Sequence, residues 1–375
     1  MKNVVLSLVA LAGIAAVANA APVSLTPNAG FGVNGWVAPV AGSTLGNANA
    51  NERSFAYNPV TGNLIIASRF GGNSLKTYSG TTGAEVGALN LGSGVISGGT
   101  FQINQVGVTR DGQIFVGNLS TDTRPTASTL NPIKIYRWAS EAASVDSTPW
   151  ASTTVASPVA AVALRMGDSM DVTGSGANAR VVMGHGNNAA IGGYTIFQAG
   201  GVKTSVTTFS PALTGSRFRL GLTFGASANE VYGKVSSDSL YGTSYVDGNA
   251  VGTRTSTAIA LTSGGESQMD YANIGGAPIL AVLDQNNSTL RVYNLTDPNN
   301  PVLLASANAT SGTLASNGNG TGAVQFGAID HANQTATIYA MASNQGISSY
   351  TFVVPAPGAA ALLALGGLVA TRRRR

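Results

Sequence analysis

The sequence of 375 residues contains no cysteine and only two histidines, and charged residues make up just 10% of it. Without cysteine the chain forms no disulfides and offers no thiolate ligands to a metal. Its stability must therefore come from a packed core, which a chain of this length is large enough to form. Its polar surface must come from Ser, Thr, Asn and glycine-rich turns, a composition typical of secreted all-β proteins.

The N-terminus has the layout of a secretory signal peptide. Lys2 precedes an apolar run from Val4 to Val17, and small residues follow at Ala18 and Ala20. This pattern predicts that residues 1–20 direct export and are removed by signal peptidase after Ala20. The alternative, an uncleaved N-terminal anchor, is disfavoured because a bilayer span needs roughly 20 apolar residues and this run is shorter.

The C-terminus, residues 354–375, reads VPAPGAAALLALGGLVATRRRR. Its apolar run is short for a membrane span. Four arginines follow this run directly, namely Arg372, Arg373, Arg374 and Arg375. Such a cluster of positive charge is retained on the cytoplasmic side of a membrane. Pro355 and Pro357 keep the stretch before the apolar run extended. The tail therefore predicts that the body is exported while the apolar segment pauses in the membrane.

Together, Pro355-Ala356-Pro357, the apolar segment and the terminal arginines resemble the PEP-CTERM sorting signal of bacterial envelope proteins. The resemblance implies cleavage near these prolines by an exosortase-like membrane protease and delivery to the cell surface or extracellular matrix. Ala356 departs from the pattern, since that family has Glu at this position. The alternative is an uncleaved membrane anchor.

The net charge of the chain comes from these two terminal segments. Lys2 and the four terminal arginines are five of the 20 basic residues, and neither segment holds any of the 16 acidic ones, so the body carries 15 − 16 = −1. No excess of positive charge remains to indicate a nucleic-acid partner.

The body, residues 21–350, shows a repeated pattern of short strands and tight turns. In its first unit we expect strands at 55–57, 63–68, 75–78 and 85–89, a meander that cannot bury its own faces. Similar units recur every 50 to 65 residues or so, beginning near Phe55, Val106, Met170, Leu220, Met269 and Phe326. A recurring four-stranded unit at this spacing is typical of propeller blades.

We therefore predict an all-β fold, a six-bladed β-propeller. The last unit has three strands, and we expect a strand around Gly35–Ala38 to complete it and close the ring. Seven blades are the alternative, because residues 91–101 and 139–163 are unassigned, and a pair of β-sandwiches would also show short alternating strands. The segments NERSFAYNPVTGNLIIASR, GGTFQINQVGVTRDGQIFVGNLS and IKIYRW resemble a domain family of unknown function in secreted bacterial proteins.

The segments GDSMD and ESQMD place Asp168 with Asp171, and Glu266 with Asp270, near expected strand starts, and GAID adds Asp330. The candidate metal ligands among these acids are Asp168, Asp171, Glu266 and Asp330. Carboxylates suit Ca²⁺, and blade-opening strands could bring them to one mouth of the central channel. The alternative is that these acids accept backbone N–H bonds and fix the inner turns. His185 and His331 lack metal-ligand spacing and are predicted to be solvated turn residues. No Gly-x-Ser-x-Gly motif supports a serine hydrolase, and no catalytic residue is predicted.

Two functions follow from these observations. The first is a non-catalytic surface or matrix protein whose propeller presents loops to exopolysaccharide or another envelope component. The second is a secreted propeller enzyme, a metal-dependent lactonase or a polysaccharide-acting hydrolase or lyase, which uses the four acidic residues. Fold alone does not decide between them, because propellers support many unrelated activities.

Overall fold

The computed structural model describes residues 23–354, except 187–190, 211–214, 236–237, 246–250, 260, 262–264, 309–314, 316 and 318. Within these residues no helix is long and apolar enough to cross a membrane. The expected signal peptide and all but the first residue of the expected sorting signal lie outside the described part of the chain. These include Ala18, Ala20, Pro355, Ala356, Pro357 and the four terminal arginines.

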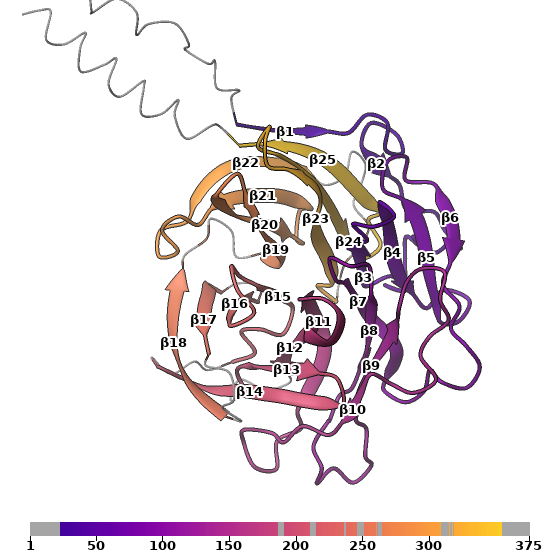
Figure 1. Ribbon diagram of the computed structural model, residues 1–375, viewed down its shortest axis with the longest axis vertical. Helices are drawn as coiled ribbons and strands as arrows, with labels where there is room; N and C mark the ends of the chain where they lie inside the picture. The colour runs from indigo at the N-terminus through magenta and orange to yellow at the C-terminus, as the bar shows by residue number, and fades with distance from the viewer. Residues whose placement is uncertain are drawn as a thin grey trace, which may run out of the picture.

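The described chain is a six-bladed β-propeller, as the repeats predict, in which consecutive antiparallel meanders surround a central axis (Figure 1). Blade 1 contains β3 (Ser54–Tyr57), β4 (Asn63–Ser68), β5 (Ser74–Ser79) and β6 (Glu85–Ala88). Blade 2 contains β7 (Phe101–Val108), β8 (Ile114–Leu119), β9 (Ile133–Trp138) and β10 (Ala151–Thr153). Blade 3 contains β11 (Arg165–Thr173), β12 (Arg180–Gly186), β13 (Tyr194–Gln198) and β14 (Gly201–Ser210). The short 3₁₀ helix η1 (Gly176–Asn178) lies between β11 and β12.

The second half of the ring repeats this order. Blade 4 contains β15 (Gly221–Phe224), β16 (Glu230–Lys234), β17 (Leu240–Ser244) and β18 (Val251–Ile259). Blade 5 contains β19 (Glu266–Ile274), β20 (Ala277–Asp284), β21 (Thr289–Asn294) and β22 (Val302–Asn308). Blade 6 contains β23 (Gly322–Asp330), β24 (Thr335–Ala342) and β25 (Ile347–Val353). The outermost strands β14 and β18 pair in parallel, so blades 3 and 4 form one continuous sheet.

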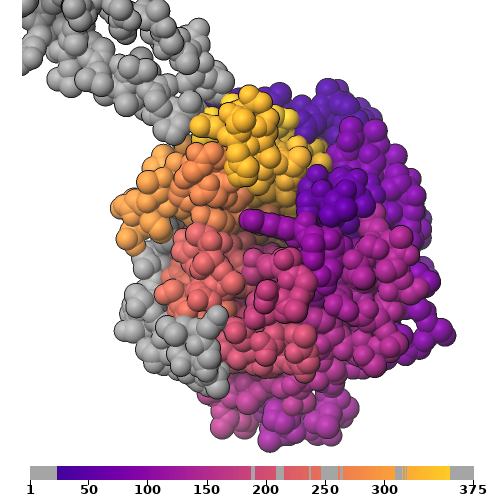
Figure 2. Space-filling view, viewed as in Figure 1, coloured from indigo at the N-terminus to yellow at the C-terminus, as the bar shows by residue number. Residues whose placement is uncertain are grey.

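The two ends of the described chain close the ring within blade 6. The closing strand is β1 (Ser24–Pro27), which pairs with β25 from Val353 back to Tyr350. The predicted strand around Gly35–Ala38 contributes only β2 (Trp36–Val37), which pairs with the other end of β25. The prediction was therefore wrong about the main closing segment but right that N-terminal residues complete the last blade. Figure 2 shows the indigo N-terminal residues directly beside the yellow final blade.

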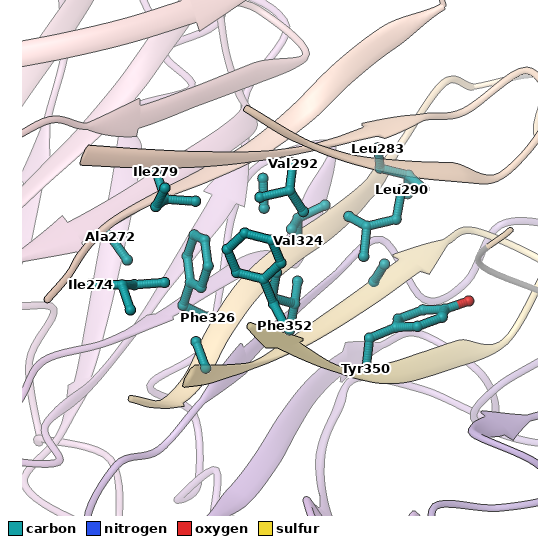
Figure 3. Close-up of a cluster of buried hydrophobic side chains, with 14 of the residues drawn as sticks. Ala272, Ile274, Ile279, Leu283, Leu290, Val292, Val324, Phe326, Tyr350 and Phe352 are labelled. Carbon is teal, nitrogen blue, oxygen red and sulfur yellow. The ribbon is translucent and has the colours of Figure 1, made fainter. Parts of the chain in front are cut away.

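Each blade packs against its neighbours through one apolar cluster, and six clusters occupy the six blade interfaces. The cluster between blades 5 and 6 includes Ile279, Val292, Phe326 and Phe352, whose side chains point toward one another between the two sheets (Figure 3). Leu25 of the closing strand packs against the same cluster. Residues that alternate along a strand thus bury both faces of every blade against another blade.

The central channel is lined by equivalent residues of the innermost strands, among them Phe55, Val106, Met170, Leu222 and Met269. The space there is small, about 30 Å³. Two segments were left unassigned by the sequence. Residues 91–101 connect β6 to β7, and residues 139–163 contain β10, the outermost strand of blade 2. Neither forms an additional blade, which excludes the seven-bladed alternative.

Candidate functional site

The channel opens at one mouth into a cavity of about 800 Å³. All six blades contribute to its wall through the C-terminal ends of their inner strands and the turns that follow. Aromatic rings in the wall come from Tyr57, Phe224, Tyr271 and Phe326. Polar and charged groups come from Thr109, Arg110, Asp171, Thr173, Thr223, Asp270, Asn273, Gln325 and His331. The cavity is therefore a mixed apolar and polar site, the composition usual for small-molecule binding sites.

Two tyrosines in this wall are held in place by a second ring. Tyr57 stacks on Tyr339 with ring centroids 5.8 Å apart, and Tyr271 stacks on Tyr232 at 6.1 Å. Both cavity tyrosines are partly exposed, whereas Tyr339 and Tyr232 are buried. Each stack fixes the orientation of a tyrosine ring that faces the cavity. Binding of a ligand therefore costs little side-chain conformational entropy at these two tyrosines.

Two carboxylates lie in the wall on alternate inner strands, Asp171 on β11 and Asp270 on β19. Thr223, on β15 between them, donates its hydroxyl to Asp171 Oδ2 at 3.1 Å and also interacts with Asp270. Asp171 Oδ2 accepts the backbone N–H of Phe224 at 2.7 Å, and Asp270 Oδ2 accepts that of Phe326 at 2.7 Å. Each carboxylate therefore ties its own blade to the next one.

The two acids share one electrostatic environment. Burial, together with the nearby Asp171 charge, raises the pKa of Asp270 to about 8. Burial also raises the pKa of Asp171, against the opposing effect of its hydrogen bonds from Phe224, Val172 and Thr223. Both shifts favour the protonated form, so the pair holds its first proton more readily than two isolated carboxylates would.

The structure does not bring the four predicted metal ligands together. Only Asp171 lines the cavity. Asp168 is buried against three arginines, and Glu266 accepts hydrogen bonds from Tyr293 and Arg291. Asp330 is the exposed last residue of β23 and accepts the backbone N–H groups of Ala332 and Asn333 in the turn that follows. Among the described residues, no group of three His, Asp or Glu side chains is placed to hold a metal ion.

The alternative interpretation of these acids describes two of them well. Asp171 and Asp330 both accept backbone N–H bonds, as that alternative predicted. Asp330 fixes the turn after β23, whereas Asp171 holds the inner strand of the next blade. Charged partners explain the other two, since a buried carboxylate is stable only when it is paired or hydrogen-bonded. The sequence thus placed these acids on the inner strands, but it did not indicate how deeply each side chain is buried or which groups it contacts.

The two histidines differ in environment. His331 lies in the predicted exposed turn and lines the cavity, where its Nδ1 accepts a long 3.4 Å contact from the Gly275 N–H. His185 was wrongly predicted to be solvated, because it is fully buried in β12 and its Nε2 lies 2.7 Å from Thr195 Oγ1. Burial lowers the pKa of His185 to about 4, so it is neutral at physiological pH.

The segment ESQMD offered both Glu266 and Asp270, and the predicted set of metal ligands included Glu266, whereas the structure places Asp270 in the site. Asp171 and Asp270 each follow a methionine that lines the channel, in the segments SMD and QMD. This repeated Met-Asp pair was the available signal, because equivalent residues of two blades occupy equivalent positions around the axis.

The chain matches no protein-family model and no curated protein. Among solved structures it is similar to a DUF4623 family protein from Bacteroides eggerthii, with a TM-score of 0.59, 15% identity, and coverage of 82% of this chain and 71% of that chain. It also resembles the major allergen Mala s 1 of Malassezia sympodialis, with a TM-score of 0.49, 12% identity, and coverage of 83% and 94%. A nidogen/laminin complex gives a TM-score of 0.43, 9% identity, and coverage of 68% and 79%. At 15% identity, the similarity to the DUF4623 family protein shows the fold alone.

Proposed function

We propose that the protein is an exported envelope or matrix protein whose propeller binds a segment of exopolysaccharide without altering it. The observation that carries this proposal is the cavity of about 800 Å³ to which every blade contributes. Its volume lies within the roughly 300–1,000 Å³ usual for ligand sites. A site built from six blades is also rigid, because each wall segment ends a strand of a packed sheet.

The wall suits a saccharide in its chemistry. The partly exposed faces of Tyr57 and Tyr271 can pack against the apolar C–H face of a sugar ring. Arg110, Thr173 and Asn273 supply donors and acceptors for hydroxyl groups. Because the net charge of the body is only −1, long-range electrostatic attraction contributes little to its capture of a polysaccharide.

Export and sorting rest on the two terminal segments. The first 20 residues have the three-part layout of a signal peptide, and the tail resembles the PEP-CTERM signal, which implies cleavage near Pro355–Pro357. The intact mass of the protein recovered from the native envelope tests this part of the proposal. We expect a chain that begins at Ala21 and ends near Pro357, and a mass that retains Arg375 would contradict processing.

The binding proposal is tested by isothermal titration with exopolysaccharide fragments from the native matrix. Arg110, an exposed residue of the β7–β8 turn, is replaced in Arg110→Gln, and Arg137→Gln serves as the control because Arg137 does not line the cavity. Loss of a hydrogen bond from a charged group should weaken binding by about tenfold in the first variant and leave the second unchanged. Equal affinities in all three proteins would refute binding in the cavity.

The carboxylate pair favours one alternative, a polysaccharide-acting hydrolase. The raised pKa of Asp270 favours the protonated form that a general acid needs, and both acids line the cavity. Against this, Oδ1 and Oδ2 of each carboxylate already accept backbone N–H bonds, which favours a structural role. Release of new reducing ends by the wild-type protein, lost in Asp270→Asn, would establish the hydrolase in place of the binding protein.

A further inference from the structure

A second polar cluster lies at the opposite mouth of the channel. The cavity is built from the C-terminal ends of the inner strands, so the N-terminal ends of these strands meet at the other face. Four arginines gather there, namely Arg53 before β3, Arg69 after β4, Arg165 at the start of β11 and Arg219 before β15. Arg53, Asp168 and Arg219 each directly precede a residue that lines the channel.

One carboxylate organises three of these arginines. Asp168 Oδ1 accepts hydrogen bonds from Arg53 at 3.1 Å and Arg165 at 2.8 Å. Its Oδ2 accepts Nε of Arg165 at 2.5 Å and Nε of Arg219 at 2.7 Å. The Asp168 side chain is 1% exposed, and the arginines lower its pKa against the effect of burial. It holds guanidinium groups from blades 1, 3 and 4 in fixed positions.

The fourth arginine adds to the positive charge of this group. The guanidinium of Arg69 lies 3.7 Å from the ring centroid of Phe101, and that of Arg53 lies 5.5 Å from the same centroid. Arg69 also donates to Asn104 Oδ1 at 3.4 Å. Within the part of the chain that the structure describes, the carboxylates found to interact with these four arginines are Asp168 and Glu52. Four cations against two acids leave an excess of 4 − 2 = +2 even when Glu52 is ionised.

The deepest arginine has an unused donor. Arg53 is 5% exposed at its side chain, and its Nε has no hydrogen-bond partner among the described residues. A buried N–H without a partner is costly, and an oxygen of a bound anion would satisfy it. Arg165 and Arg219 are 21% and 33% exposed, so the cluster is reached from solvent.

We propose that this arginine cluster, formed by Arg53, Arg69, Arg165 and Arg219, is a binding site for a carboxylate or sulfate group. Asp168 holds three of the guanidinium groups in place and offsets only part of their charge. Their planar donors match the oxygens of either anion. The site is separate from the cavity, because the narrow part of the channel lies between the two mouths.

The test uses the full body with sodium glucuronate, sodium sulfate and neutral glucose as probes in separate titrations, followed by NMR or calorimetry. The matched pair of variants is Arg219→Gln and Arg137→Gln. Arg219 is 33% exposed with Nε 2.7 Å from Asp168, and Arg137 is 34% exposed with Nε 2.7 Å from Asp146. Arg165→Gln is a second variant of the cluster, and melting temperatures show that each protein is folded.

We expect glucuronate, sulfate or both to bind the wild type and Arg137→Gln, with affinity reduced about tenfold or more in Arg219→Gln and Arg165→Gln. Stronger binding of glucuronate would assign the site to a sugar acid, and stronger binding of sulfate to a sulfate group. The proposal is overturned if neither anion binds, if glucose binds as well as they do, or if all variants bind alike. Arg110→Gln should leave anion binding unchanged, so failure here is distinguishable from failure of polysaccharide binding in the cavity.

Discussion

Replacing Asp168 with asparagine should destabilise the protein strongly, although the two side chains have nearly the same shape. The wild-type carboxylate accepts four hydrogen bonds from three arginines. An asparagine keeps one acceptor oxygen, carries no charge and turns an NH₂ group toward other donors. Removing one partner of a buried ion pair costs about 3–5 kcal/mol, because the remaining charge is left without compensation.

The size of this effect can be expressed as a melting temperature. With an unfolding entropy of about 2.1 cal/mol/K per residue over roughly 330 residues, a loss of ~3–5 kcal/mol lowers the melting temperature by about 4–7 °C. Differential scanning calorimetry at pH 7 measures it. A change below about 1 °C would refute the argument that Asp168 compensates buried charge.

A second substitution shows which charge is responsible. Arg53 is 5% exposed and cannot turn to water, whereas Arg219 is 33% exposed and can. In the Asp168→Asn background, Arg53→Gln should therefore restore more stability than Arg219→Gln. The reverse order would mean that the loss comes from geometry and not from buried charge.

Three further predictions concern packing and pH. Phe352→Ala removes a fully buried ring at the interface of blades 5 and 6 and should cost about 3–5 kcal/mol in urea unfolding. Because the folded-state pKa of Asp270 is raised to about 8, the folded protein keeps a proton that the unfolded chain releases near pH 4, so stability falls as pH rises through this window. Asp270→Asn should remove this fall in thermal melts between pH 4 and 9. Burial lowers the pKa of His185 to about 4 in the folded state. The stability that the neutral imidazole contributes is therefore fully present above its unfolded pKa of roughly 6.5 and is lost as the pH falls toward 4. In His185→Gln the melting temperature should therefore depend less on pH over that range than it does in the wild type.

Each of these has a contrary outcome. A cost below about 1 kcal/mol for Phe352→Ala would mean that the interface cluster rearranges to fill the cavity. Asp270→Asn and His185→Gln act in opposite directions, so each is compared with the wild type at every pH. A wild-type pH slope that survives unchanged in either variant would show that the group in question does not titrate as argued.

The strands within blades could be predicted because their signals are local. Residues 63–68 and 75–78 lie in strands as predicted, since short runs bounded by glycine and asparagine turns specify strand ends within a few residues. The closing strand at Ser24–Pro27 was missed because four residues show too little alternation to be recognised. Its partner is the last described strand of the chain, and no local pattern indicates such a pairing.

The candidate site was predicted only in part, because the spacing of residues along one strand does not show which mouth of the channel each side chain lies near. Asp168 and Asp171 are three residues apart on β11, and an odd separation directs side chains to opposite faces of a regular strand. The register of β11 against β12 also shifts between Met166 and Met170. Asp168 also lies in the N-terminal half of β11 and Asp171 in its C-terminal half, so the two acids belong to different mouths. A ligand set that contained both could not form one site.

The path of the chain makes the two mouths unequal during the proposed sorting. Val354, the last described residue, donates its N–H to the carbonyl of Gln334 in the turn between β23 and β24, close to the cavity-lining His331. The described chain therefore ends on the cavity face, at the outer edge of blade 6 where β1 also begins. The residue from which the proposed sorting signal continues is thus nearer to the cavity than to the arginine cluster. Cleavage near Pro357 would free the cavity face, so polysaccharide binding in the cavity should depend on processing and anion binding by the arginine cluster should not.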